Sequence, residues 1–97
     1  MSKRDKLSAP VLSAFVAGHA GWQHTDNALV KTFEFSDYAG GIAFVVHVGF
    51  AADKRDHHPD LLVSYRKVEA RWSTHDAGGV TGLDVEMAEH CDRLHHA

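Results

Sequence analysis

The hydrophobic pattern of this chain changes period several times along its length, and these changes restrict the fold more than any other feature. Residues 29–35 alternate, with Leu29, Phe33 and Phe35 on one face, which is typical of a half-buried strand. Residues 38–53 then place apolar side chains three or four positions apart, which predicts a helix. Residues 67–74 return to strict alternation and predict a second half-buried strand.

The N-terminal third of the chain adds a helix and a short strand to this pattern. We expect the helix to begin at Ser8, a good N-cap residue, with a proline in its first turn and Gly18 close to its end. Residues 22–24 predict a strand that forms a hairpin with 29–35 through a turn at 25–27. Residues 1–6 are polar and are expected to be disordered.

The central helix is expected to supply much of the core. Ser36 or Asp37 can cap it, and Pro59 closes the segment because the residue before a proline avoids the helical region. Its glycines weaken the helix but allow another backbone to approach closely. From the spacing, we predict that its buried face consists of Tyr38, Ile42, Val45, Val46 and Phe50.

The C-terminal part predicts a second hairpin and a last helix. Residues 61–65 and 67–74 form the hairpin, and the last helix begins at Thr81, with Asp84 in the capping-box position three residues later. Its predicted buried stripe is Leu83, Met87, Cys91 and Leu94. The element order α-β-β-α-β-β-α therefore predicts an α+β fold in which three helices cover one face of a four-stranded antiparallel sheet.

Composition restricts the class of protein further. A chain of 97 residues predicts one domain, residues 1–97, and a formal charge of −3 gives no basic surface for nucleic acid. No apolar run approaches the roughly 20 residues that cross a bilayer, and we recognise no signal peptide. The single cysteine, Cys91, fits a reducing compartment. We expect a cytoplasmic protein without nucleic-acid or membrane partners.

Three of the nine histidines lie in one patterned stretch of the chain. His57, His58 and His75 are accompanied by Asp53 and Asp84 at fixed offsets. Imidazole is the side chain whose ordinary pKa lies near neutrality, so it can donate or accept a proton at pH 7. In a chain too small for a large cofactor domain, this group predicts proton transfer on a small molecule.

The same stretch resembles the signature of the pterin-4a-carbinolamine dehydratases. That signature is an acidic residue, three spacers, His-His-Pro, an aromatic residue, a later histidine and a final aspartate. Asp53, residues 57–59, Tyr65, His75 and Asp84 meet every spacing. The family block Thr-His-Asp-x-Gly-Gly-Leu-Thr-x-x-Asp is matched at 74–84 with valine in place of leucine, a Gly-Trp pair at 21–22 also agrees, and the resemblance covers residues 8–94.

This resemblance implies an enzyme, a 4a-hydroxytetrahydrobiopterin dehydratase (a hydro-lyase). It would remove water from the 4a-hydroxy-tetrahydropterin to give the quinonoid dihydropterin, which recycles the cofactor of aromatic amino acid hydroxylases. The resemblance implies that His57, His58 and His75 are catalytic and line the pterin pocket, with His58 and His75 as acid and base. Two or three imidazoles around one ring suit a reaction that adds one proton and removes another.

Further residues of the signature are expected to bind or orient. Asp53 and Asp84 would orient or tune histidines, although the capping-box position alone could also explain Asp84. Ser73 and Thr74 would offer backbone groups to the pterin, and Pro59 would shape its loop. Asp53 departs from the family, which often has glutamate there, and is one methylene shorter. Whether the signature aromatic, at position 65, packs or lines the pocket is left open.

The resemblance implies neither cofactor nor metal. Adjacent histidines rarely face one ion, and their spacing fits no zinc template. It does imply self-association as a homodimer or homotetramer, with edge strands pairing across a two-fold axis. The alternative is a non-catalytic dimerisation or assembly factor on the same fold, or a pterin-binding protein without turnover. A pure scaffold has no reason to hold His57, His58 and His75 together.

Overall fold

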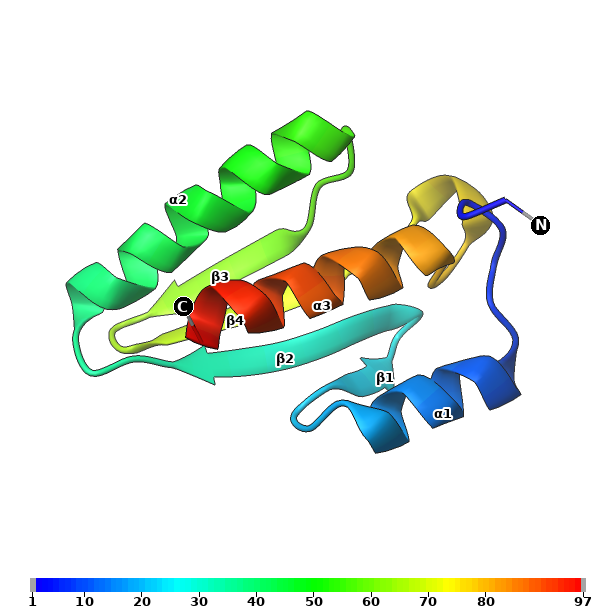
Figure 1. The fold of residues 1–97 in the computed structure, drawn as a ribbon, viewed down its shortest axis with the longest axis horizontal. Helices are drawn as coiled ribbons and strands as arrows, with labels where there is room; N and C mark the ends of the chain where they lie inside the picture. The colour runs from blue at the N-terminus through cyan, green and yellow to red at the C-terminus, as the bar shows by residue number, and fades with distance from the viewer. Residues whose placement is uncertain (1, 97) are drawn as a thin grey trace.

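The computed structural model describes residues 2–96, and its element order is the predicted one (Figure 1). The helices and strands are α1 (Ala9–Gly18), β1 (Gln23–Thr25), β2 (Ala28–Glu34), α2 (Tyr38–Arg55), β3 (Asp60–Ser64), β4 (Lys67–Trp72) and α3 (Gly82–His96), with a short 3-10 helix, η1 (His75–Ala77), before α3. The α+β class is confirmed. No helix in the described part of the chain is both long and apolar enough to cross a membrane.

The four strands form one antiparallel sheet in the order β1-β2-β4-β3. β2 and β4 are central, with Leu29 opposite Trp72 and Phe33 opposite Val68. These four side chains are fully or almost fully buried because they point toward the helices, whereas alternate residues such as Glu69 point to the uncovered face. The predicted faces of both central strands are therefore correct.

One hydrophobic core joins the helices to the sheet, and it includes both tryptophans and the single cysteine. Trp22 and Trp72 are 2% and 0% exposed, as expected for core residues. Cys91 is fully buried on α3, and burial raises the pKa of its thiol to about 11. The thiol is therefore protonated at neutral pH and packs as a small apolar side chain.

The predicted buried face of α2 is only partly correct, because Ile42 and Val45 are half-buried whereas the other three predicted residues are exposed. Phe44 is 4% exposed, whereas Phe50 is 71% exposed. Val46 and Tyr38 also lie on the outer side, each about half exposed. The face that meets the sheet consists of Gly41, Phe44, Val48 and Ala52.

Two apolar rows on α2 share a helical spacing, so periodicity could not decide between them. Gly41 lies on the row that faces the sheet, where the lack of a side chain lets α2 come close to β4. A Cβ added to Gly41 would lie 3.4 Å from Cγ2 of Val68 on β4. A larger side chain on this side of the first turn would push the helix away from the sheet.

The N-terminal segment also differs from expectation, because the described residues before α1 contact the start of α3. Lys6 forms an antiparallel bridge with Thr81, and the amide of Leu83 donates to the carbonyl of Lys3 at 3.1 Å. These backbone contacts replace the disorder expected for residues 2–6. Residue 1 lies outside the described residues.

The two faces of α2 lead to a direct test by mutation. Phe44→Ala should lower the free energy of unfolding by about 3–5 kcal/mol, because it removes a ring from the core. Phe50→Ala, on the same helix, should change it by less than about 0.5 kcal/mol because its ring is exposed. Urea unfolding of both variants measures the difference. Equal losses would show that the ring of Phe50 is covered by another molecule in solution.

Candidate active site

The predicted site residues lie at the end of the sheet where α2 finishes and β4 leads into η1. The register of β3 and β4 brings the two segments together, since Asp60 lies opposite Arg71. Two residues beyond this pair on the respective strands are His58 and Ser73, and both border the same depression in the protein surface. The hairpin therefore aligns parts of the sequence that lie fifteen residues apart.

The end of α2 directs its two histidines to different environments. Asp56 follows the helix in the left-handed conformation with φ 50°, and its amide donates to the carbonyl of Asp53. An aspartate tolerates this conformation better than most residues, and it stops the helix abruptly. After this turn His57 is buried, whereas His58 remains exposed.

His57 is held by a buried carboxylate. Its Nε2 lies 2.5 Å from Oδ1 of Asp84, which is 0% exposed, and its ring stacks on Trp72 with a centroid separation of 5.7 Å. The other carboxylate oxygen, Oδ2, accepts hydrogen bonds from the hydroxyl of Thr74 at 2.7 Å and the amide of Thr81 at 2.9 Å. Asp84 therefore makes one of the two hydrogen bonds of the predicted capping box, to the amide of Thr81, and fixes a histidine at the same time.

His58 has a much looser carboxylate partner. Its Nε2 lies 3.4 Å from Oδ1 of Asp53, and both side chains are more than half exposed. A contact of this length between exposed groups contributes little to stability. Asp53 therefore lies beside His58 without fixing it, and the ring of His58 is free to meet a ligand from solvent.

His75 faces the same region from the other segment. It begins η1 and is exposed, and it borders three adjoining depressions of 210, 330 and 300 Å³ that all include Ser73. The 330 Å³ depression also contains His57 and His58. Its size lies at the lower end of the range for small-molecule sites, about 300–1,000 Å³. The three histidines therefore share one opening large enough for a small heterocycle.

Comparison with known proteins identifies the family of the chain. Residues 5–94 match the family described as pterin 4 alpha carbinolamine dehydratase. The chain belongs to this family. A relative in a Bradyrhizobium species (strain BTAi1), named "Putative pterin-4-alpha-carbinolamine dehydratase", is 41% identical over 92 residues, which are 93% of each chain. Another with the same name, from Metallosphaera sedula, is 40% identical over 89 residues, 92% of this chain and 93% of the relative.

Solved structures of the dehydratase family show the same architecture. A transcriptional coactivator/pterin dehydratase from Brucella melitensis superposes with a TM-score of 0.88 at 29% identity, covering 93% of this chain and 98% of the other. A pterin dehydratase-like protein identified as a RuBisCO assembly factor in the alpha-carboxysome has a TM-score of 0.69 at 20% identity, covering 81% and 94%. At 20% identity, this second structure shows that the fold is shared and nothing more.

Two residues of the dehydratase signature, Tyr65 and Pro59, are not part of the histidine group. Tyr65 lies in the β3–β4 turn, 73% exposed with φ 34°, at the opposite end of β3 from His58. Its ring packs against the guanidinium of Arg66, with the carbon 5.5 Å from the ring centroid. Tyr65 therefore does not line the histidine depressions of its own chain. Pro59 is half-buried between His58 and β3 and guides the chain into the sheet.

The structure adds two cations that sequence reasoning missed. Arg4 borders the 330 Å³ depression from the N-terminal segment, and Arg71 borders the 210 Å³ depression from β4. The alternation of residues 67–74 places Arg71 on the solvent-facing side of β4, so its side of the sheet was predictable. Arg4 gave no such signal, because its segment has no periodicity; backbone contacts with α3 and the ion pair between Lys3 and Glu86 hold that segment in place.

The buried carboxylate predicts unequal effects at the two aspartates. Asp84→Ala should lower the free energy of unfolding by about 3–5 kcal/mol, because His57, Thr74 and the amide of Thr81 lose their buried acceptor. Asp53→Ala, which removes an exposed carboxylate, should change it by less than about 0.5 kcal/mol. Urea titration of both variants tests this, with Asp84→Asn expected to lie between them. A loss at Asp84 no larger than at Asp53 would refute a structural role for the buried carboxylate.

Proposed function

We propose that this chain catalyses the dehydration of 4a-hydroxytetrahydrobiopterin to the quinonoid dihydropterin, which recycles the pterin cofactor of aromatic amino acid hydroxylases. The observation that carries the proposal is the convergence of His57, His58 and His75 on one depression of 330 Å³. Membership of the dehydratase family supports it. The coactivator/pterin dehydratase from Brucella melitensis also supports it, because it is 29% identical to this chain and superposes on 93% of it with a TM-score of 0.88.

The chemistry requires two proton transfers around one ring. The C4a–O bond breaks as the hydroxyl oxygen accepts a proton and leaves as water, and N5 loses its proton as the N5–C4a double bond forms. We assign these transfers to His58 and His75, which are both exposed on the same depression and come from different segments. A neutral imidazole can accept one proton while an imidazolium donates the other.

His57 has a different proposed role from the other two histidines. Its Nε2 is engaged by the buried carboxylate of Asp84, so only the remainder of the ring is available to the substrate. We therefore assign His57 to the catalytic pocket as a rigid wall and hydrogen-bonding group, oriented by Asp84. Asp53 would bias the position of His58, while Pro59 would hold the loop on which both histidines lie.

The pterin's polar edge would meet the strand that leaves β4. The amide of Thr74 already donates to the carbonyl of Gly79 at 2.9 Å, and its hydroxyl is bound to Asp84. The hydroxyl of Ser73 donates to the carbonyl of Asn27 at 2.8 Å. We therefore assign the substrate contacts to the backbone at Ser73, with Thr74 supporting it. Proton transfer alone completes this reaction, so we propose that it uses no cofactor and no metal. We also propose that the protein acts in the cytoplasm.

Substitution of the two exposed histidines tests the proposal. His58→Ala and His75→Ala should each lower the rate of dehydration roughly 10²–10⁴-fold, as expected when a general acid or base is removed. His47→Ala, an exposed histidine on α2, is the matched control and should retain the wild-type rate. Ultraviolet absorbance of freshly generated carbinolamine follows the reaction. If the folded wild-type protein gives no acceleration, the enzyme proposal fails.

A second candidate function is an interaction module built on the same fold. The exposed apolar row on α2, with Phe50 at 71% and Tyr38 and Val46 about half exposed, is suited to contact with another protein. This role does not require the three histidines to converge, so we place it second. It becomes the leading proposal if the dehydration assay fails with folded protein.

We also propose that the chain forms a homodimer or homotetramer. β3 and β1 are the outer strands of the sheet, and each leaves one edge without a partner strand among residues 2–96. Pairing of two five-residue β3 edges across a two-fold axis would extend the sheet and remove an exposed edge.

Light scattering after size exclusion tests the assembly. The wild type should elute at twice or four times the mass of one chain. Leu62→Lys, at the centre of β3, should shift it toward the monomer, because a lysine on an edge strand opposes pairing. Thr32→Lys places the same charge on the open face of the central strand β2 and should leave the mass unchanged. A monomeric wild type would refute the assembly.

A further inference from the structure

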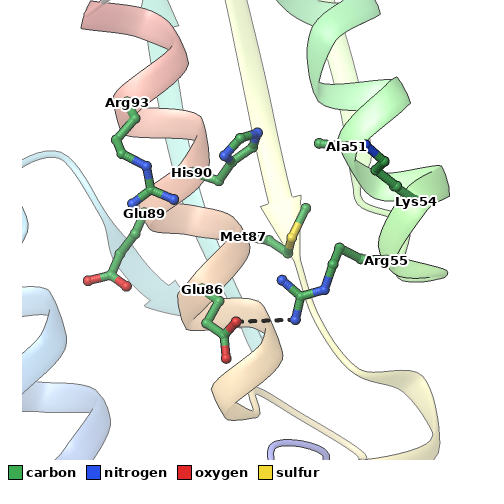
Figure 2. Close-up of a pocket in the computed structure, with 8 residues that line it drawn as sticks. All are labelled: Ala51, Lys54, Arg55, Glu86, Met87, Glu89, His90 and Arg93. Atoms are coloured by element: carbon green, nitrogen blue, oxygen red, sulfur yellow. Dashed lines mark hydrogen bonds and ion pairs between the residues drawn. The ribbon is translucent and has the colours of Figure 1, made fainter.

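A separate groove lies in the helical layer, between the C-terminal half of α2 and the middle of α3 (Figure 2). It has a volume of 260 Å³ and shares no lining residue with the histidine depressions. The half-buried Ala51 of α2 and Met87 of α3, which is 2% exposed, form its apolar floor. Methionine is unbranched and adapts to ligands of different shape, so this surface can fit an apolar body.

The charges at the rim of this groove do not balance. Lys54, Arg55 and Arg93 line it against two carboxylates: Glu86 pairs with Lys3 at 2.8 Å and Arg55 at 3.1 Å, and Glu89 lies 3.1 Å from Nε2 of His19. The hydrogen bonds from Lys3 and Arg55 hold the pKa of Glu86 below its usual value, so it remains ionised in these pairs.

Two cations at the groove are left without such partners. Lys54 and Arg93 line it from opposite helices, and neither forms an ion pair with any residue between 2 and 96. The rim therefore carries an uncompensated positive charge above an apolar surface. This combination favours a ligand with one anionic end and one apolar end.

A histidine lies between the two cations. His90 projects from α3 toward α2 and is half-buried (Figure 2). Burial, together with the charges of Arg93 and Arg55, lowers its pKa, so it is neutral at pH 7 in the free protein. The imidazole can then donate a hydrogen bond to an anion without itself supplying the charge.

We propose that this groove binds a small organic carboxylate with an apolar body, its carboxylate attracted to the net positive rim of Lys54 and Arg93 beside His90 and its apolar part against Ala51 and Met87. A second copy of the chain fits less well, because a two-fold contact sets equal patches against each other and would bring these cations near their own copies. The proposal is independent of the dehydratase reaction, since the groove contains none of its residues.

Titration with octanoate, followed by NMR of the methionine methyl and histidine ring signals, tests this site. Octanoate should shift the signals of Met87 and His90, and 1-octanol, which has a similar chain without the charge, should bind at least about fivefold more weakly. Lys54→Gln and Arg93→Gln should each weaken octanoate binding about two- to fivefold, the range expected for one exposed charge contact. Lys67→Gln, an exposed cation on β4, is the control and should have no effect.

Two further variants separate the groove from the rest of the surface. Ala51→Leu fills the groove and should weaken octanoate binding roughly tenfold, because overfilling a packed site is costly. Ala43→Leu makes the same change on the exposed side of α2 and should leave binding unchanged. Octanoate binding unaffected by Ala51→Leu, or absent shifts at Met87 and His90, would overturn the proposal.

The pKa of His90 can be measured with and without ligand, and it would not change if the residues lining the groove had only a structural role. A bound carboxylate favours the charged imidazole, so octanoate should raise the pKa of His90, and octanol should not. The groups that face it are Lys54 and Arg55 from α2, and Glu86, Glu89 and Arg93 from its own helix. Equal affinity for octanoate and octanol would reject anion recognition. Ligand-free, concentration-dependent shifts at Met87 would instead indicate that a second copy fills the groove, and would overturn the proposal.

Discussion

The buried carboxylate of Asp84 is the contact on which the arrangement of the site depends. Its two oxygens meet His57 from the end of α2, Thr74 from the end of β4 and the amide of Thr81 at the start of α3. Three segments that are distant in sequence therefore share one acceptor in the interior. A buried carboxylate is tolerated only when its oxygens are hydrogen-bonded, and this requirement fixes the relative positions of the helix cap and the histidine.

The sheet supplies the second constraint on the site. The pairing of Asp60 with Arg71 sets the register of β3 and β4, and this register carries His58 and Ser73 to the same edge. A slip of one residue would turn the side chains of β3 to the opposite face and move His58 away from His75. Rigid strands therefore place catalytic candidates that lie on loops, while those loops leave His58 and His75 open to solvent.

Much of this arrangement could be predicted from the sequence, and the failures share a physical cause. Alternation identified the buried faces of β2 and β4, and the capping-box spacing located Asp84. On α2, however, two apolar rows had the same period, and the close approach at Gly41 that selects one of them is a tertiary contact. The N-terminal segment was expected to be disordered because its contacts with α3, which are backbone hydrogen bonds and one exposed ion pair of Lys3 with Glu86, leave no periodic residue pattern.

The helices α2 and α3 are joined where α2 ends and α3 begins, and the groove between them lies further along α3. The ion pair between Arg55 and Glu86 spans the two helices at 3.1 Å, but both side chains are at least a third exposed, so it adds little to their association. The buried contact of His57 with Asp84, two residues away on each segment, joins the same two segments more strongly. With the helix ends held by that contact, the groove between the half-buried His90 of α3 and Ala51 of α2 stays open above the buried Met87.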